Sequence, residues 1–355
     1  MSLRYIAASL GLSVTTVSRA LAGYSDVAEE TRRRVKAEAE RIGYVPNVIA
    51  RRLQKGRTDA IGVAAPVGRD AIADVYLYTA FAATWARLSE IDRDLVMLPS
   101  VSDCNHPECE SRTFKRAVEE RRVDGLILFH TLRDDWRISY LQQARIPFVV
   151  FGAEHPELPE VTSIGVDNAG VVSKILTRLA GFGHRRVALV VPEGHYAFAE
   201  TRVTAFAAAA PAHGMEIRLA PAAFSESGGR ATTARLLDEP NHATAIVYFS
   251  SRMTLGGLRA ISDSVLVPGR HVSVISFGDN ANLLYASPPV TAVAAPVDDM
   301  AHHAIDVLIG EIEGKPIEPI RRWPLTLVRR QSDGPLVPPP SVGAWVGGEV
   351  VGEPG

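Results

Sequence analysis

Residues 6–21 read "IAASLGLSVTTVSRAL", two short apolar runs separated by a glycine. Ala7 is small enough for two helices to cross closely at its position. Gly11, four residues later, can take the left-handed backbone conformation that a tight turn needs. Val17, six residues further on, can pack the second helix back onto the first. This spacing predicts a helix-turn-helix.

The helices of this motif have recognisable ends. Apolar periodicity predicts helices over residues 3–10, 14–21 and 28–42. Ser13 suits the N-cap position of the second helix, and Gly43 follows the third. Apolar residues form one stripe of the second helix, so its opposite face carries hydroxyl side chains and one arginine.

Charge is distributed unevenly along the chain, whose formal net charge is −2. Residues 1–58 contain eleven Lys or Arg against five Asp or Glu, so the rest of the chain is acidic. A basic head favours a polyanionic partner such as a nucleic acid. An ordinary solvated helix is the alternative, because "EETRRRVKAEAER" (29–41) has Glu and Arg at i,i+4 spacing. Charge alone leaves both open.

Composition limits the class of protein. The chain has 355 residues, 46% of them hydrophobic, which is enough for two or three domains with their own cores. Neither a signal-peptide pattern nor a run of about eighteen apolar residues is visible, so we expect a cytoplasmic protein without a membrane partner. Cys104 and Cys109 are too few for a disulfide framework or a closed zinc site, and we expect no metal and no cofactor.

Further segments are distinctive in combination with residues 6–21. They are "VAEETRRRVKAEAERIGYVPNVIARRLQKGRTDAIGV" (27–63), "RVDGLIL" (122–128), "IPFVVFG" (146–152), "VDNAG" (166–170), "GHRRVALV" (183–190), "SPPVTAV" (287–293) and "PLTLVRRQS" (324–332). Together they resemble the lactose and galactose repressor (LacI/GalR) family of transcription regulators over roughly residues 3–332. The resemblance implies a helix-turn-helix domain over 1–45, a hinge helix and linker over 46–58, and a ligand-binding body over 59–331.

By this resemblance the helix over 14–21 lies in the major groove of DNA. The positions that match base-contacting residues are Val14, Thr15 and Arg19, and those that match backbone-contacting residues are Ser13, Thr16 and Ser18. A guanidinium can bond two acceptors of one guanine, whereas Val and Thr methyls sense only a thymine methyl or shape. Arg19 is therefore the expected main reader. The alternative is a surface ion pair with an acid such as Glu29 or Glu30.

A second DNA contact is expected from the segment that begins at Pro46, which suits the first position of a helix. An isolated helix of about eight residues is barely stable in water, so this hinge should fold only against DNA and a partner copy. The resemblance places Asn47, Arg51 and Leu53 at the minor groove, with Leu53 wedged between base pairs. An ordinary core contact is the alternative for Leu53.

The rest of the chain alternates strand-like and helical segments. Strands are predicted within 60–67, 93–100, 124–131, 147–153, 185–193, 245–251 and 271–279. Helices are predicted over 76–91, 110–121, 170–181, 200–213, 229–237 and 254–264. This order is typical of α/β domains with doubly wound parallel sheets. A break near Val161 predicts two subdomains, 59–160 with a C-terminal return and 161–290, which the resemblance describes as periplasmic-binding-protein-like. The Pro- and Gly-rich segment 332–355 predicts a disordered tail.

Ligands of open α/β sheets bind at the carboxyl ends of the strands. The resemblance and this rule select Arg202, Phe277, Asp279 and Ser250 as effector-binding candidates. Asp167 and Asn168 are equally suited to cap a helix. Two segments depart from the family: Gly152 stands where an aspartate is usual, and the chain reads Ser250-Ser251-Arg252-Met253-Thr254 where many members have Asn-Asp ahead of Met-Ala. If Arg252 faces the cleft, its positive charge would favour an anionic sugar derivative as the effector.

The resulting hypothesis is a sequence-specific transcription regulator, most simply a repressor, that binds a palindromic operator in the nucleoid as a homodimer. A small effector, a sugar, sugar acid or sugar phosphate, controls its affinity. The alternative is a cytoplasmic sugar-binding or sugar-modifying protein with the same body, and a third reading is a non-specific architectural protein. No enzyme motif of the common phosphate-loop, nucleophile-elbow or His-Glu-x-x-His types is present, and His184 is better explained as structural.

Overall fold

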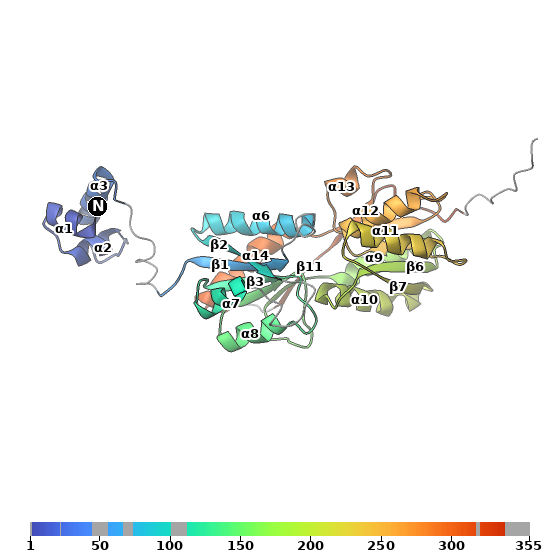
Figure 1. Ribbon diagram of the computed structural model, residues 1–355, viewed down its shortest axis with the longest axis horizontal. Helices are drawn as coiled ribbons and strands as arrows, with labels where there is room; N and C mark the ends of the chain where they lie inside the picture. The colour runs from blue at the N-terminus through green and yellow to red at the C-terminus, as the bar shows by residue number, and fades with distance from the viewer. Residues whose placement is uncertain are drawn as a thin grey trace, which may run out of the picture. The chain divides into compact units, whose positions relative to one another are not determined.

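The computed structural model describes residues 2–21, 23–44, 56–66, 74–100, 112–316 and 320–337. They fall into two compact units, a head that ends at Asp59 and a body that begins at Ala60 (Figure 1). The hinge candidates Asn47, Arg51 and Leu53 lie outside the described residues, as do Cys104 and Cys109. Of the helices within the described ranges, none combines the length and apolar character that crossing a membrane requires.

The head is a three-helix unit. Its helices are α1 (Leu3–Leu10), α2 (Val14–Leu21) and α3 (Glu29–Arg41), as the apolar periodicity predicts. Gly11 ends α1 in the left-handed region, with φ 66°. Ile6, Val17 and Val35 are fully buried, so one residue from each helix meets the other two in a small core.

The body contains two parallel-dominated sheets of six strands each. The first has the order β11-β5-β4-β3-β1-β2, with bounds β1 (Ala60–Pro66), β2 (Asp94–Ser100), β3 (Gly125–Phe129), β4 (Phe148–Phe151), β5 (Ser163–Val166) and β11 (Ile320–Trp323). The second has the order β12-β10-β9-β8-β6-β7, with bounds β6 (Arg186–Pro192), β7 (Glu216–Ala222), β8 (Ala245–Tyr248), β9 (Ser273–Phe277), β10 (Thr291–Ala294) and β12 (Thr326–Val328). Of these pairs, β10 and β12 run antiparallel. The α/β fold class is thus confirmed.

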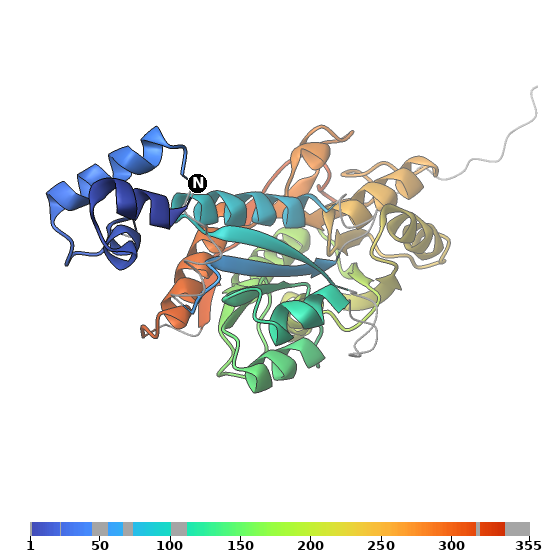
Figure 2. The ribbon, with the colours of Figure 1, turned by 60° about the vertical axis from the view of Figure 1, so that its left-hand side comes forward.

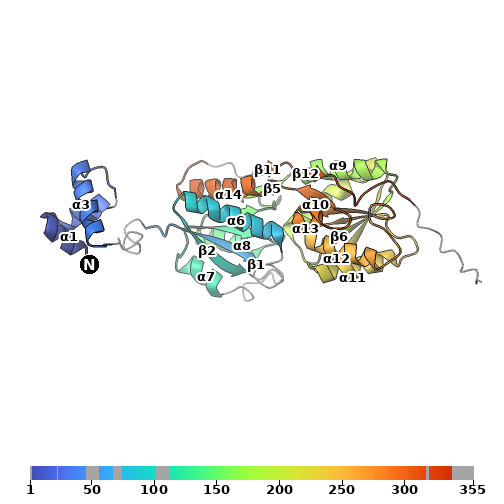
Figure 3. The ribbon, with the colours of Figure 1, turned by 90° about the horizontal axis from the view of Figure 1, so that it is seen from above.

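Helices cover both faces of each sheet (Figures 1 and 3). We call the first sheet with α6 (Val75–Glu90), α7 (Arg112–Glu119), α8 (Trp136–Ala144) and α14 (Val297–Ile312) the first lobe. The second sheet forms the second lobe with α9 (Asn168–Gly181), α10 (Ala197–Ala209), α11 (Glu226–Leu237), α12 (Ser251–Ser262), α13 (Ala281–Leu284) and the 3-10 turn η1 (Pro211–His213). In the first lobe α6 and α14 pack side by side (Figure 2). Strands β3 and β9 are buried along their whole length, as expected for parallel sheets covered on both faces.

The boundary between the lobes differs from the break predicted near Val161. Strand β5 pairs with β4, so it belongs to the first lobe and the prediction was one strand too early. The described chain passes between the lobes after β5, after β10 and after β11. The return to the first lobe consists of α14 and β11, whereas β10 stays in the second lobe.

The predicted disorder from Ser332 onward is wrong for residues 332–337. Ser332 is fully buried, and its Oγ donates to the Val274 carbonyl at 2.6 Å. Asp333 is buried against Arg178 in an ion pair. Composition suggested an unstructured segment, but side chains that satisfy the polar groups of β9 and its neighbours hold this segment to the second lobe. Residues 338–355 lie outside the described part of the chain.

Candidate DNA surface and effector cavity

The outer face of α2 presents the side chains proposed from the sequence. The Ser13 Oγ accepts a hydrogen bond from the Thr16 backbone nitrogen at 2.9 Å, so it caps α2, and it lies 2.8 Å from the Thr16 hydroxyl. Val17 and Ala20 are buried against the head core. The exposed positions of this segment include Ser13, Val14, Thr15 and Arg19, while Thr16 and Ser18 are half-buried.

Arg19 pairs with Asp26 instead of Glu29 or Glu30. Its Nε lies 3.3 Å from the Asp26 Oδ1, and its Nη2 contacts the other carboxylate oxygen. The guanidinium also lies 4.9 Å from the centre of the Tyr24 ring. Both charged side chains are about half exposed, and such surface pairs contribute at most about 1 kcal/mol. A better acceptor pair on a base could therefore replace Asp26.

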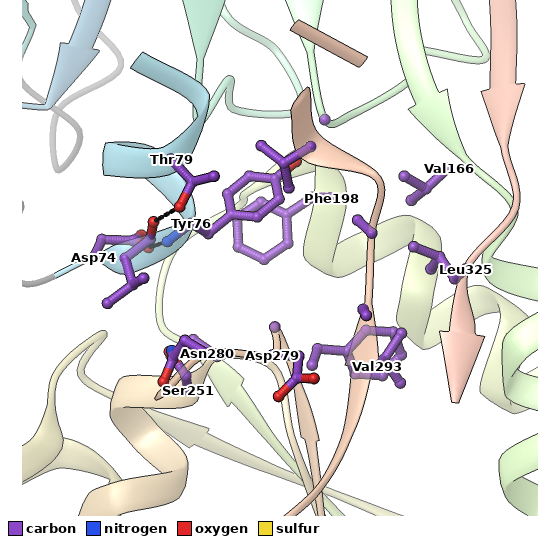
Figure 4. Close-up of a pocket in the computed structure, with 18 of the residues that line it drawn as sticks. Asp74, Tyr76, Thr79, Val166, Phe198, Ser251, Asp279, Asn280, Val293 and Leu325 are labelled. Atoms are coloured by element: carbon purple, nitrogen blue, oxygen red, sulfur yellow. Dashed lines mark hydrogen bonds between the residues drawn. The ribbon is translucent and has the colours of Figure 1, made fainter. Parts of the chain in front are cut away.

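A cavity of about 350 Å³ lies between the lobes of the body (Figure 4). It is lined by residues that follow β3, β4, β8 and β9, so it lies at the carboxyl ends of strands from both sheets. Its size is at the lower end of the range for small-molecule sites. Aromatic rings form much of its wall: Tyr76, Phe151, Phe198, Phe224, Phe249 and Phe277.

Arg202 brings a guanidinium from α10 to this cavity. Its guanidinium carbon lies 4.4 Å from the ring centre of Phe277 and 5.0 Å from that of Phe198. The Nη1 donates to the Phe249 carbonyl at 3.2 Å, but the buried Nε has no hydrogen-bond partner among the described residues. Burial lowers the pKa of Arg202 to about 10, so the group remains charged at neutral pH. This arrangement leaves a donor available for a ligand oxygen.

The other effector candidates, Phe277, Asp279 and Ser250, line the same cavity. Asp279 is occupied by Arg330, whose Nη1 and Nη2 lie 2.8 and 2.7 Å from its two oxygens. Ser250 caps α12, because its Oγ accepts from the Met253 nitrogen at 3.2 Å. Both side chains keep further hydrogen-bonding capacity, yet each also has a structural role.

Sequence reasoning missed the contribution of the first lobe. Asp74 caps α6 by accepting from the Tyr76 and Leu77 nitrogens, and its Oδ2 lies 3.7 Å from the His130 Nε2. Burial lowers the pKa of His130, which favours its neutral form. An N-cap signal before the helical pattern could have identified Asp74. His130 has φ 48° just after β3, and no sequence pattern announces that conformation.

Arg252 does not line the cavity. Its guanidinium bonds both oxygens of Glu226 on α11, at 2.9 and 2.7 Å. The argument for an anionic effector from an inward-facing Arg252 is therefore wrong, because the charge is already paired within the second lobe. Asp167 caps α9 by accepting from the Gly170 nitrogen at 2.9 Å, which supports its structural role.

His184 is a structural residue of the second lobe. Its Nδ1 lies 3.0 Å from the Thr244 hydroxyl, and its Nε2 lies 3.0 Å from the Gly334 carbonyl and 2.8 Å from the Ser273 hydroxyl. Burial lowers its pKa. Within the described ranges, no group of three or more His, Cys, Asp or Glu side chains is arranged to hold a metal ion.

Comparison with known proteins relates both units to bacterial regulators. Residues 2–47 match the bacterial regulatory proteins of the lacI family, and residues 176–332 match the periplasmic binding protein-like domain. The HTH-type transcriptional regulator RafR of Escherichia coli is 38% identical over 250 residues, which cover 70% of this chain and 72% of RafR. The HTH-type transcriptional regulator AglR of Rhizobium meliloti (strain 1021) is 31% identical over 358 residues, 98% of this chain and 99% of AglR.

Solved structures show the same architecture. The complex of the transcriptional regulator CelR with cellobiose has 26% identity and a TM-score of 0.68, over 94% of this chain and 99% of that chain. The lac repressor dimer bound to operator and the anti-inducer ONPF has 23% identity and a TM-score of 0.80, also over 94% and 99%. At 23% identity, the likeness to the lac repressor concerns the fold alone.

Proposed function

This chain belongs to the lacI family of bacterial regulatory proteins and is a helix-turn-helix transcription regulator, not an enzyme, and we propose that a neutral saccharide bound in the body cavity sets its affinity for an operator. One observation carries the proposal. Arg202 offers a buried Nε that has no hydrogen-bond partner in the described parts of the chain, beside the Phe277 and Phe198 rings. Saccharides present hydroxyl oxygens on their edges and C–H groups on their faces, which match a donor flanked by aromatic surfaces.

The charge of the cavity favours a neutral ligand over a sugar acid or a sugar phosphate. The described lining residues include four acidic side chains and one arginine, Arg202. The acidic residues are Asp74, Asp279, Asp298 and Asp299. Even with Asp279 paired to Arg330, the acidic side chains outnumber the guanidinium. An anionic ligand would meet like charges in a partly desolvated site. The likeness to the cellobiose complex of CelR supports the same ligand class.

For the DNA surface we retain the assignments made from the sequence. Arg19 is the proposed main base reader with Val14 and Thr15, and Ser13, Thr16 and Ser18 are the proposed backbone contacts. The exposure of Ser13, Val14, Thr15 and Arg19 supports a DNA-facing surface on this segment, to which Thr16 and Ser18 contribute as half-buried residues. Asn47, Arg51 and Leu53 remain proposed minor-groove residues of the hinge. Two copies of the chain would read two half-sites in the cytoplasm, on the nucleoid.

Coupling between cavity and operator requires two states of the body. The cavity wall comes from both lobes, and the chain passes between them after β5, β10 and β11. A saccharide that contacts both lobes would stabilise one relative arrangement over another. Since β1 follows the hinge region directly, that arrangement would change how two hinge segments are presented to DNA.

A thermal-shift panel tests the ligand class. Glucose, galactose, cellobiose, gluconate and glucose 6-phosphate are each added to the wild-type chain, Arg202→Ala and Arg259→Ala. Arg259 lies on α12 with its side chain 71% exposed, so it controls for loss of a surface arginine. We expect a neutral sugar to raise the melting temperature of the wild type and Arg259→Ala but not of Arg202→Ala. Stabilisation by the anionic probes alone, or equal stabilisation of Arg202→Ala, would contradict the proposal.

A further inference from the structure

Tyr76 places a hydroxyl group in the effector cavity from the first lobe. The residue lies in the first turn of α6, and its ring projects into the cavity (Figure 4). The ring packs against Phe151 with 6.3 Å between centres. The Tyr76 hydroxyl has no hydrogen-bond partner within the part of the chain that the structure describes. A half-buried phenol that no described residue bonds is available to a ligand.

Gly152 provides the space for this hydroxyl. It follows β4 directly and lines the cavity with φ 83°. A β-carbon built on Gly152 would lie 3.1 Å from the Tyr76 Oη, closer than ordinary van der Waals contact. A β-carbon at position 152 would therefore require the phenol to shift by a few tenths of an ångström, and the positive φ would strain any residue other than glycine. Because residue 152 is a glycine, the Tyr76 hydroxyl from another element can lie beside it.

Tyr76 and Arg202 face the same cavity from opposite lobes. Burial and the Asp74 carboxylate raise the pKa of Tyr76, and the nearby Arg202 charge opposes that rise. The Arg202 Nε can only donate, whereas a phenol can donate or accept. A sugar hydroxyl between them can accept from Arg202 and donate to the Tyr76 Oη, which satisfies both protein groups at once.

We propose that Tyr76 is a specificity-determining residue of the effector site, where its hydroxyl and Arg202 hold one hydroxyl group of a saccharide between the two lobes. This inference rests on the proposed function, because it assumes a saccharide ligand. A sugar that lacks this hydroxyl leaves a buried donor unpaired, so the site selects against it. Gly152 contributes by leaving room for the phenol.

The competing explanation is that Tyr76 only supplies ring surface. Phe151 and the other aromatic side chains of the wall already form such a surface, and a phenylalanine at position 76 would preserve it. Tyr76→Phe therefore separates the two explanations, because it removes the hydroxyl and keeps the ring. Tyr78→Phe is the matched control: it is the same change on the same helix, at a residue that is 68% exposed.

The test measures affinities by calorimetry for glucose, galactose and cellobiose and for the 2-, 3-, 4- and 6-deoxy forms of the two hexoses. The proteins are the full-length wild type, Tyr76→Phe, Tyr78→Phe and Arg202→Ala. We expect Tyr76→Phe to lower the affinity for the parent sugar about 3- to 10-fold, the loss expected for one hydrogen bond. One of the deoxy sugars lacks the hydroxyl group that Tyr76 contacts. For that sugar, the ratio of the affinity for the parent sugar to the affinity for the deoxy sugar should fall towards one in Tyr76→Phe. Tyr78→Phe should keep the wild-type affinities and ratios.

The outcomes distinguish this proposal from the one it rests on. If a neutral sugar binds the wild type and loses affinity in Arg202→Ala, but Tyr76→Phe keeps every wild-type affinity ratio, Tyr76 is not a specificity residue and the proposed function stands. Equal losses for parent and all deoxy sugars in Tyr76→Phe would assign Tyr76 to packing alone. If none of the neutral sugars binds the wild type, the proposed ligand class and the role of Tyr76 are both rejected.

Discussion

At the scale of single residues, the two arginines expected to recognise ligands differ in their surroundings. Arg19 is exposed and pairs with Asp26 beside Tyr24. Arg202 lies among aromatic rings, and its Nε has no partner in the described structure. An exposed ion pair is weak because solvent screens it, so the Arg19 guanidinium can give up Asp26 and bond a guanine instead. Arg202 is already desolvated, so a ligand oxygen that meets its Nε removes an existing cost.

Replacing Arg19 with alanine tests base reading. We expect Arg19→Ala to lose about 1–3 kcal/mol of discrimination between an operator selected in vitro from a random pool and a scrambled duplex. Fluorescence anisotropy at fixed salt gives both affinities. Arg33→Ala, which removes an exposed arginine of α3, serves as the control for charge and should retain discrimination. Equal losses on the two duplexes would assign Arg19 to phosphate contact only.

At the scale of elements, local patterns were most successful where a segment carries its own boundaries. Helices α1 and α2 lie at the predicted residues because Gly11 and Ser13 mark their ends. Sequence reasoning missed the longer elements β7, α8 and α14, and also β5, β10, β11 and β12, which are only three or four residues long. Such short runs show no period, and only pairing with a neighbouring strand makes them strands. Residues 332–337 were misassigned for the same reason, since their order comes from contacts with distant strands.

The attachment of that last segment should depend on pH through His184. The pKa of His184 is about 6.5 in the unfolded chain, and burial lowers it in the folded protein. As the pH falls below about 6.5, the unfolded chain therefore binds more protons than the folded protein. The contribution of neutral His184 to the free energy of unfolding is therefore fully present above about pH 6.5, and it is lost as the pH falls through the lower pKa of the folded state. Urea unfolding between pH 7.5 and pH 5 should show a shallower decline in His184→Asn than in the wild type. His195→Asn, at an exposed side chain, should keep the wild-type slope, and parallel slopes in all three would contradict the prediction.

At the scale of the whole molecule, the basic head and the acidic body agree with a regulator that approaches DNA with its head. The body adds a cavity whose walls come from both lobes, so a ligand bound there would contact elements far apart in the sequence. Reading two half-sites of an operator, as proposed above, would require a second copy of the chain. The exposed side chain of Trp85 on α6 would offer a place for it, because a large aromatic residue that is 65% exposed gains by burial against a partner.

Self-association should therefore weaken when that surface becomes charged. We expect Trp85→Glu to shift the dimer towards monomer by at least about tenfold in dissociation constant, since buried aromatic anchors dominate interface energies. Sedimentation equilibrium over a range of concentrations measures the shift. Leu219→Glu makes a comparable change at an exposed position on β7 and should leave the equilibrium unaltered. A wild-type dissociation constant for Trp85→Glu would exclude α6 from the interface.

The sequence by itself determined what depends on neighbours along the chain. The spacing of Ala7, Gly11 and Val17 determined the helix-turn-helix, and the alternation of strands and helices determined the class of the body. Its match to a family also selected Arg202, which lines the cavity. These features follow from periodicity and from residues whose conformational preferences are local.

Only the tertiary structure decided which of these residues meet. Tyr76 lies beside Gly152, Asp279 is occupied by Arg330, and Arg252 turns away to Glu226. Each pair joins elements separated by many residues, and a local pattern carries no information about which strands become neighbours. The lining of the body cavity was therefore decided by the order of the strands in two sheets, because that order brings the ends of distant segments to one place.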